Sequence, residues 1–92
     1  MHDEIVRARV EAYGRVQGVF YRDTMRSAAS ELGITGSSVN RADGSVESIF
    51  EGSRGGVEEM IERAREGSRG AVVERLEVAW EDPEGLTGFA TG

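Results

Sequence analysis

The chain has 92 residues, and its 17 acidic and 11 basic side chains give it a formal net charge of −6 at pH 7. Every basic residue is an arginine, and the sequence contains neither lysine nor cysteine. We expect one small domain over residues 1–92, because a chain of this length builds a single core. The lack of cysteine excludes disulfides, thiolate zinc sites and cysteine nucleophiles. The acidic balance argues against a general nucleic-acid binder, which needs a surplus of cations.

No apolar run reaches the roughly 18 residues of a membrane span. The first residues are acidic, unlike those of a signal peptide. We therefore expect a soluble, cytoplasmic protein with neither a membrane nor a nucleic acid as partner. The acidic side chains form no cluster with the character of a metal site, so no metal is expected. A monomer is the default expectation for a chain this short.

The first elements follow from the spacing of apolar residues. Apolar and charged residues alternate over residues 5–13, which predicts a strand with one buried face. A loop with two glycines follows, over residues 14–20. Apolar residues then recur at helical spacing from Met25 to Leu32, and Gly33 is suited to end that helix.

A hairpin is predicted over residues 39–50, with Asp43-Gly44 at its turn. Apolar residues at helical spacing return over residues 57–64. Acidic side chains at the start of this second helix and arginines near its end suit the helix dipole, and Gly67 lies just beyond it.

Residues 72–81 alternate again and predict a third long strand, which Pro83 ends. Its expected inward-facing residues are Leu76, Val78 and Trp80. With a short fifth strand around Phe89, the order is β-α-β-β-α-β-β. This order predicts an α+β, ferredoxin-like two-layer sandwich, with two helices on one face of an antiparallel sheet. Because this fold hosts many functions, the function must be argued from a site.

The segment from Gly14 to Arg22 is the candidate site. Glycines at positions 14 and 18 allow successive N–H groups to turn toward one point, and the helix start that follows adds free N–H donors. A plain glycine-rich connector is the alternative interpretation. Arg22 lies near the first helical turn, where a cation is unfavourable by about 0.3–1 kcal/mol. A bound anion would explain it, since the guanidinium can grip two phosphate oxygens; a surface salt bridge is the alternative.

Residues 14–22, Gly-Arg-Val-Gln-Gly-Val-Phe-Tyr-Arg, resemble the signature loop of the acylphosphatase family. The resemblance continues in order and spacing through Leu32-Gly33-Ile34-x-Gly36, Asn40, residues 43–47, Gly52 and residues 80–86. It implies hydrolysis of the carboxyl–phosphate bond of small acyl phosphates, without metal or cofactor. By position, Arg22 matches the family's phosphate-binding arginine and Asn40 the asparagine that holds the attacking water. The residues that match its phosphate-binding loop are Arg15, Val16, Gln17, Gly18, Val19 and Phe20.

The residues agree with that chemistry. An acyl phosphate is already activated, so positioning and charge stabilisation can suffice without a covalent nucleophile. Asn40 can donate to and accept from a water but has no useful pKa, so we expect the substrate's own phosphate to take the proton. Asn40 is alternatively a turn former. The alternative function is a non-catalytic phosphate- or carbamoyl-phosphate-binding accessory module.

Two further expectations concern packing. Ser37 and Ser38 stand where relatives commonly place a tryptophan and a valine, so we expect them to weaken the strand that presents Asn40. Four large apolar residues are expected in the core rather than at a ligand: Phe20, Met25, Phe50 and Met60.

The net charge poses a problem, because an acidic protein must bind an anionic substrate. We expect a local positive pocket made by Arg15, Arg22, the loop amides and a helix end. The acidic, lysine-free composition indicates either adaptation to a salt-rich cytoplasm or a codon bias that replaces lysine with arginine.

Overall fold

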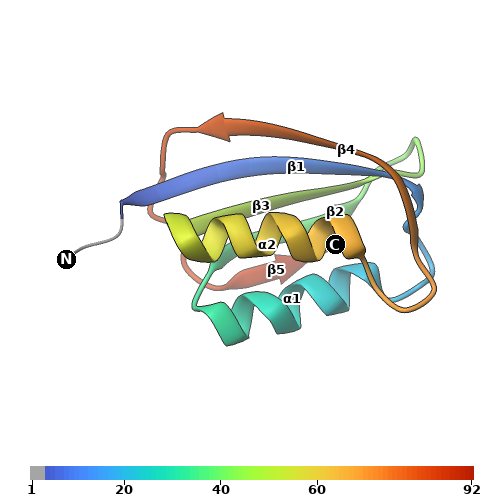
Figure 1. Cartoon of the computed structure of the whole chain (residues 1–92), viewed down its shortest axis with the longest axis horizontal. Helices are drawn as coiled ribbons and strands as arrows, with labels where there is room; N and C mark the ends of the chain where they lie inside the picture. Colours follow the sequence, from blue (N-terminus) through green and yellow to red (C-terminus); the bar gives the residue numbers. More distant parts are fainter. Residues whose placement is uncertain (1–3) are drawn as a thin grey trace.

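Two helices cover one face of a five-stranded sheet (Figure 1). The computed structural model describes residues 4–92. The elements in chain order are β1 (Ile5–Arg15), α1 (Tyr21–Leu32), β2 (Thr35–Asn40), β3 (Val46–Ser53), α2 (Arg54–Glu66), β4 (Val72–Glu81) and β5 (Phe89–Thr91). Neither helix within residues 4–92 is long and apolar enough to cross a membrane.

The strand order across the sheet is β4-β1-β3-β2-β5. β1 pairs antiparallel with both β3 and β4, and β2 pairs antiparallel with β3. The predicted ferredoxin-like α+β fold, with its short fifth strand, is confirmed. The sheet is mixed rather than antiparallel, however, because β5 pairs parallel with β2. Residues 82–88, which we call the crossover segment, carry the chain from β4 at one edge to β5 at the other.

The core lies between the sheet and the helices. Along β1 the even-numbered side chains of residues 6–12 are buried, as the alternation predicts. The register places Phe50 of β3 opposite Ala8, so this buried face continues onto β3. The helices complete the core with the predicted apolar stripes, whose buried members lie at residues 25–29 in α1 and 57–64 in α2.

β1 is longer than the alternation indicates. It continues to Arg15, and its register against β4 shifts between Tyr13 and Gly14. A Cβ atom at Gly14, where φ is +124°, would lie 2.3 Å from the carbonyl oxygen of Val72. Glycine is therefore required at this irregularity because β4 approaches too closely for any side chain.

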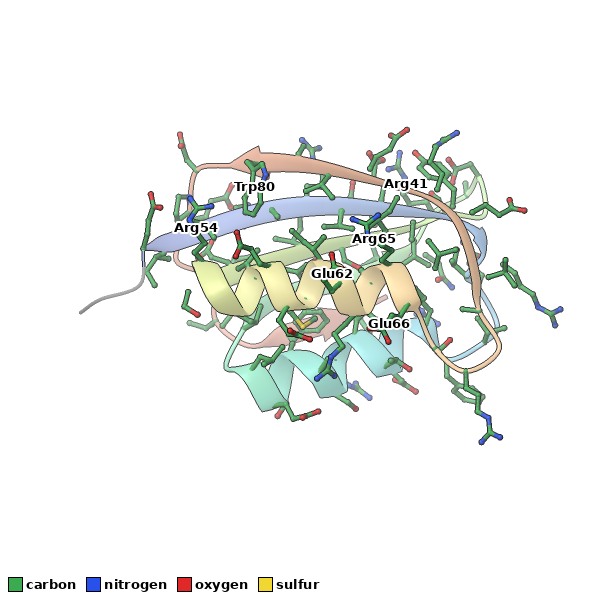
Figure 2. The ribbon with its side chains drawn as sticks, viewed as in Figure 1. Arg41, Arg54, Glu62, Arg65, Glu66 and Trp80 are labelled. Atoms are coloured by element: carbon green, nitrogen blue, oxygen red, sulfur yellow. The ribbon has the colours of Figure 1, made fainter. Side chains whose placement is uncertain are left out.

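The prediction that β4 turns its apolar residues into the core is only half right. Trp80 and Val78 share the helix-facing side with Ala8 and Val10, their partners on β1. β4 is an edge strand, however, and Trp80 remains 50% exposed. Figure 2 shows Trp80 beside Arg54, whose guanidinium carbon lies 5.5 Å from the centroid of the indole.

β2 is complete despite its two serines. Ser38 lies directly opposite Ser48 of β3, both are fully buried, and their hydroxyl oxygens are 3.0 Å apart. Each hydroxyl therefore has a hydrogen-bond partner in the core. The structure shows the strand that carries Asn40 in full register with β3, and a polar pair takes the place of the apolar contact expected there.

Candidate active site

A pocket of about 320 Å³ lies where the loop after β1, the start of α1 and the end of β5 meet. Its lining residues are Val16, Gly18, Phe20, Tyr21, Arg22, Asp23 and Thr91. The loop and Arg22 were predicted from the sequence to lie together. Tyr21, Asp23 and Thr91 were not, and Thr91 comes from the far end of the chain.

The start of α1 faces this pocket without a side-chain cap. Gly18 and Phe20 both have left-handed backbones, with φ of 74° and 61°. Phe20 occupies the N-cap position of α1 and makes no capping hydrogen bond. By contrast, Ser53 caps α2 by accepting a hydrogen bond from the N–H of Gly56. The N–H groups of the first turn of α1 and the positive end of its dipole therefore favour an anion in the pocket.

The loop is fastened on two sides. The side-chain amide of Gln17 donates to the carbonyl oxygens of Arg41 and Ser45, at 2.8 and 2.9 Å, and so ties the loop to the β2–β3 hairpin. The hydroxyl of Ser68 donates to the carbonyl oxygen of Val19 at 2.5 Å. The Gln17 side chain is thus an anchor, and these hydrogen bonds fix the loop against the β2–β3 hairpin and against Ser68.

Arg22 and Asn40 meet through one atom of residue 92. The Arg22 guanidinium donates to the carbonyl oxygen of Gly92 at 2.7 Å, and the main-chain N–H of Asn40 donates to the same oxygen at 2.8 Å. The N–H of Gly92 in turn donates to the carbonyl of Ser38. Arg22 lies in the pocket, whereas Asn40 stands beside it at the end of β2 with an exposed side chain.

The structure divides the six loop residues predicted to bind phosphate. Val16, Gly18 and Phe20 line the pocket. Arg15 does not, because it is the last residue of β1 and pairs with Val72 of β4. Gln17 and Val19 lie outside the lining and carry the two anchors of the loop.

Tyr21 fixes the floor of the pocket. Its buried hydroxyl donates to the carbonyl oxygen of Ala64 at 2.7 Å, which ties the start of α1 to the last turns of α2. Burial raises the pKa of the Tyr21 hydroxyl well above its ordinary value of 10.0, so it stays protonated. The sequence gives no signal for this bond, since its partner is a main-chain oxygen 43 positions away.

The expected core residues Met25, Phe50 and Met60 are fully buried, but Phe20 is not. Its side chain is 79% exposed at the pocket. The prediction for Phe20 was wrong because the left-handed backbone at the start of α1 turns this residue away from the core.

The charge of Arg22 remains available to a ligand. Within residues 4–92, no Asp or Glu side chain pairs with it, and the contact that its guanidinium makes is with the main-chain oxygen of Gly92 at 2.7 Å. Asp23, the acidic residue in the lining, pairs with Arg26 at 3.0 Å. On the neighbouring hairpin, Arg41 pairs with Glu11 and Glu47.

Comparison with known proteins agrees with this arrangement. The acylphosphatase family model matches residues 8–91. A curated acylphosphatase from Haloarcula marismortui is 51% identical over 83 residues, covering 90% of this chain and 91% of that protein. One from Trichormus variabilis is 46% identical over 86 residues, covering 94% and 85%. The crystal structure of acylphosphatase from Bacillus subtilis matches with a TM-score of 0.91 at 30% identity, covering 95% of this chain and 98% of that one. The chain belongs to the acylphosphatase family.

Proposed function

We propose that Arg22 and the loop after β1 hold the phosphoryl group of a small acyl phosphate while Asn40 orients the water that attacks it. Membership of the family, with curated relatives of that name along nine-tenths of the chain, makes the protein an acylphosphatase enzyme. One observation carries the phosphate-binding role: Arg22, which pairs with no Asp or Glu side chain within residues 4–92, and a helix start without a side-chain cap line the same pocket.

The phosphoryl oxygens would be held by two kinds of donor. The N–H groups at the start of α1 supply fixed dipoles, and Arg22 supplies a charged fork. One Arg22 nitrogen is committed to Gly92, which fixes the orientation of the guanidinium and leaves its other donors for the ligand. A preorganised donor of this kind contributes on the order of 10²–10³ in rate.

The water would attack phosphorus from the side of Asn40. The main-chain N–H of Asn40 is committed to Gly92, which holds the residue in place while its side-chain amide remains exposed. As the water oxygen bonds to phosphorus, the bond from phosphorus to the carboxyl oxygen breaks. The water proton passes to a phosphoryl oxygen, and the carboxylate leaves as a stable anion. No general acid is needed, because this leaving group is already weakly basic.

Phosphate release from benzoyl phosphate, in the presence of a chelator, tests this assignment. We expect Arg22→Lys to lose nearly as much activity as Arg22→Ala, because a lysine cannot replace the two-pronged contact. Arg65→Lys, on the exposed face of α2, is the matched control and should keep full activity. A highly active Arg22→Lys would contradict the bidentate role. An inactive wild type that still binds phosphate would favour the alternative, a phosphate- or carbamoyl-phosphate-binding accessory module.

We also propose that the enzyme works as a cytoplasmic monomer whose acidic surface suits high salt. The support is the composition, with a formal charge of −6 and no lysine. Figure 2 shows Glu62 and Glu66 on α2 together with Arg65, which pairs with Glu62. Salt screens the repulsion between such charges. The free energy of unfolding should therefore rise between low and molar salt, and indifference to salt would favour codon bias instead. Sedimentation would test the monomer.

A further inference from the structure

Phe20 is placed where neither packing nor backbone preference favours it. Of the large apolar side chains in residues 4–92, it has the highest exposed fraction, 79%. It is also the one residue other than glycine with a positive φ in that part of the chain. A non-glycine residue held in this conformation is strained. The free protein thus gains no stability from a phenylalanine at this position, and such strain is typical of functional sites.

The conformation of Phe20 is imposed by its neighbours. Its carbonyl oxygen accepts two hydrogen bonds from Thr24, one from the main-chain N–H at 3.0 Å and one from the hydroxyl at 2.9 Å. One residue before it, the carbonyl of Val19 is held by Ser68. Because the backbone is fixed on both sides, the side chain leaves the loop from a defined place at the pocket.

The ring supplies the exposed apolar surface of the pocket. The other large lining side chains of apolar character, Val16 and Tyr21, are buried and form its floor. The remaining lining residues are glycine or polar. When the phosphoryl group occupies the donors at the start of α1, the acyl group must extend outward past this surface.

We propose that the Phe20 ring contacts the acyl group and makes the enzyme selective for acyl phosphates with an apolar or aromatic acyl group over those with a small one. This inference rests on the proposed function. An aromatic contact contributes a factor of about ten at most in selectivity, since a ring pair adds about 0.5–1.5 kcal/mol. Acetyl and carbamoyl groups are too short to cover the ring and would gain little from it.

The test compares kcat/KM for benzoyl phosphate and acetyl phosphate in the wild type and in Phe20→Gly, Phe20→Leu and Phe20→Tyr. Glycine adopts the left-handed backbone without strain, so Phe20→Gly removes the ring and keeps the loop conformation. We expect its ratio of benzoyl to acetyl kcat/KM to fall by about twofold to tenfold, with Phe20→Leu intermediate and Phe20→Tyr close to wild type. The inhibition constant of inorganic phosphate should stay unchanged in all three.

Trp80→Ala is the control, because it removes an exposed aromatic residue on β4 that lies outside the pocket. Its ratio should equal that of the wild type. An unchanged ratio in Phe20→Gly, with both substrates still hydrolysed, would overturn the selectivity role and leave the proposed function intact. A wild type that hydrolyses neither substrate would overturn both.

Discussion

Glu51 of β3 should be the carboxylate whose loss costs this protein the most stability. It lies on the sheet face opposite the helices and is only 4% exposed. Its oxygens accept hydrogen bonds from the main-chain N–H groups of Glu84, Gly85 and Leu86, at 2.8, 2.7 and 3.0 Å. Arg7 of β1 completes the set at 3.4 Å. One side chain thus holds the crossover segment onto the sheet.

The size of the stability loss follows from the groups that the Glu51 carboxylate leaves without a partner when it is removed. Breaking a buried ion pair from one side costs about 3–5 kcal/mol. Arg7 keeps Glu81 at 3.1 Å as a partner, so we expect the lower end, about 3 kcal/mol, for Glu51→Ala. For a domain of this size this predicts a fall in Tm of roughly 12–24 °C. Glu47→Ala is the matched control on the same strand face, because Glu47 is more exposed and, among the described residues, its ion pair is the one with Arg41. It should cost less than about 1 kcal/mol.

Urea unfolding measures how much unfolding free energy Glu51→Ala loses, and hydrogen exchange shows which residues are destabilised. Because the crossover segment leads into β5 and Gly92, exchange should accelerate first over residues 84–92, before the amides of β1 and β3. In the milder variant Glu51→Gln, exchange should accelerate in the same order of segments but by a smaller factor. A loss below 1 kcal/mol in Glu51→Ala, or uniform acceleration throughout the sheet, would refute the idea that Glu51 clamps the segment.

The same contacts determine how the free energy of unfolding depends on pH. Burial by itself would raise the pKa of Glu51, but the main-chain N–H groups of Glu84, Leu86 and Gly85, with Arg7, outweigh it and hold the pKa below its ordinary value of 4.5. A carboxyl with a depressed folded-state pKa stabilises the fold above its unfolded pKa. That stabilisation is lost as the pH falls through the folded pKa. The wild type should therefore lose stability steeply below pH 4.5, and Glu51→Gln should flatten that part of the curve.

Three further predictions concern the pocket. Asn40→Ala should lower kcat far more than it raises the dissociation constant of inorganic phosphate, because Asn40 is assigned to the attacking water. Steady-state kinetics measure kcat, and a phosphate titration measures the dissociation constant. Equal losses in both would show that Asn40 anchors the phosphate instead. Tyr21→Phe should cost about 1 kcal/mol in urea unfolding, because the Ala64 carbonyl loses its buried donor; a loss near zero would mean that water replaces the hydroxyl. Arg69 follows Ser68, the anchor of Val19, and is not among the residues that line the pocket. Arg69→Gln should therefore lower kcat/KM about twofold at low salt through the local field and leave kcat unchanged. An effect that persists in molar salt would indicate direct contact with substrate.

Local signals were enough to predict the elements. The alternation of β1, the apolar stripes of the two helices and the Asp43-Gly44 turn each depend on neighbours within a few residues, and all are confirmed. The loop after β1 was predictable in part: Gly18 has the left-handed backbone expected next to the helix start, whereas Gly14 belongs to β1 and the anchors of the loop at Arg41, Ser45 and Ser68 come from distant segments.

The parts that escaped prediction depend on contacts between distant segments. The short strand around Phe89 was expected, but its parallel pairing with β2 was not, because three residues carry no periodicity that indicates a partner strand. The exposure of Trp80 depends on β4 lying at an edge, which follows from strand order and not from the alternation. Likewise, nothing near Glu51 in the sequence indicates that a carboxylate on a strand will accept bonds from residues 33 to 35 positions later.

The pairing of the arginines explains how an acidic protein offers a site to an anion. Within residues 4–92, eight arginines form ion pairs with carboxylates, and these are Arg7, Arg9, Arg26, Arg41, Arg54, Arg63, Arg65 and Arg75. The other three arginines lie close to the phosphate-binding loop. In the chain, Arg15 precedes the loop and Arg22 follows it. Arg69 comes directly after Ser68, whose hydroxyl holds the carbonyl of Val19 in the loop. In the part of the chain that the structure describes, the arginines that pair with no Asp or Glu side chain therefore lie in or near the loop and its anchor. A net charge of −6 and an attractive local field are compatible, because screening limits each exposed charge to a range of about 10 Å.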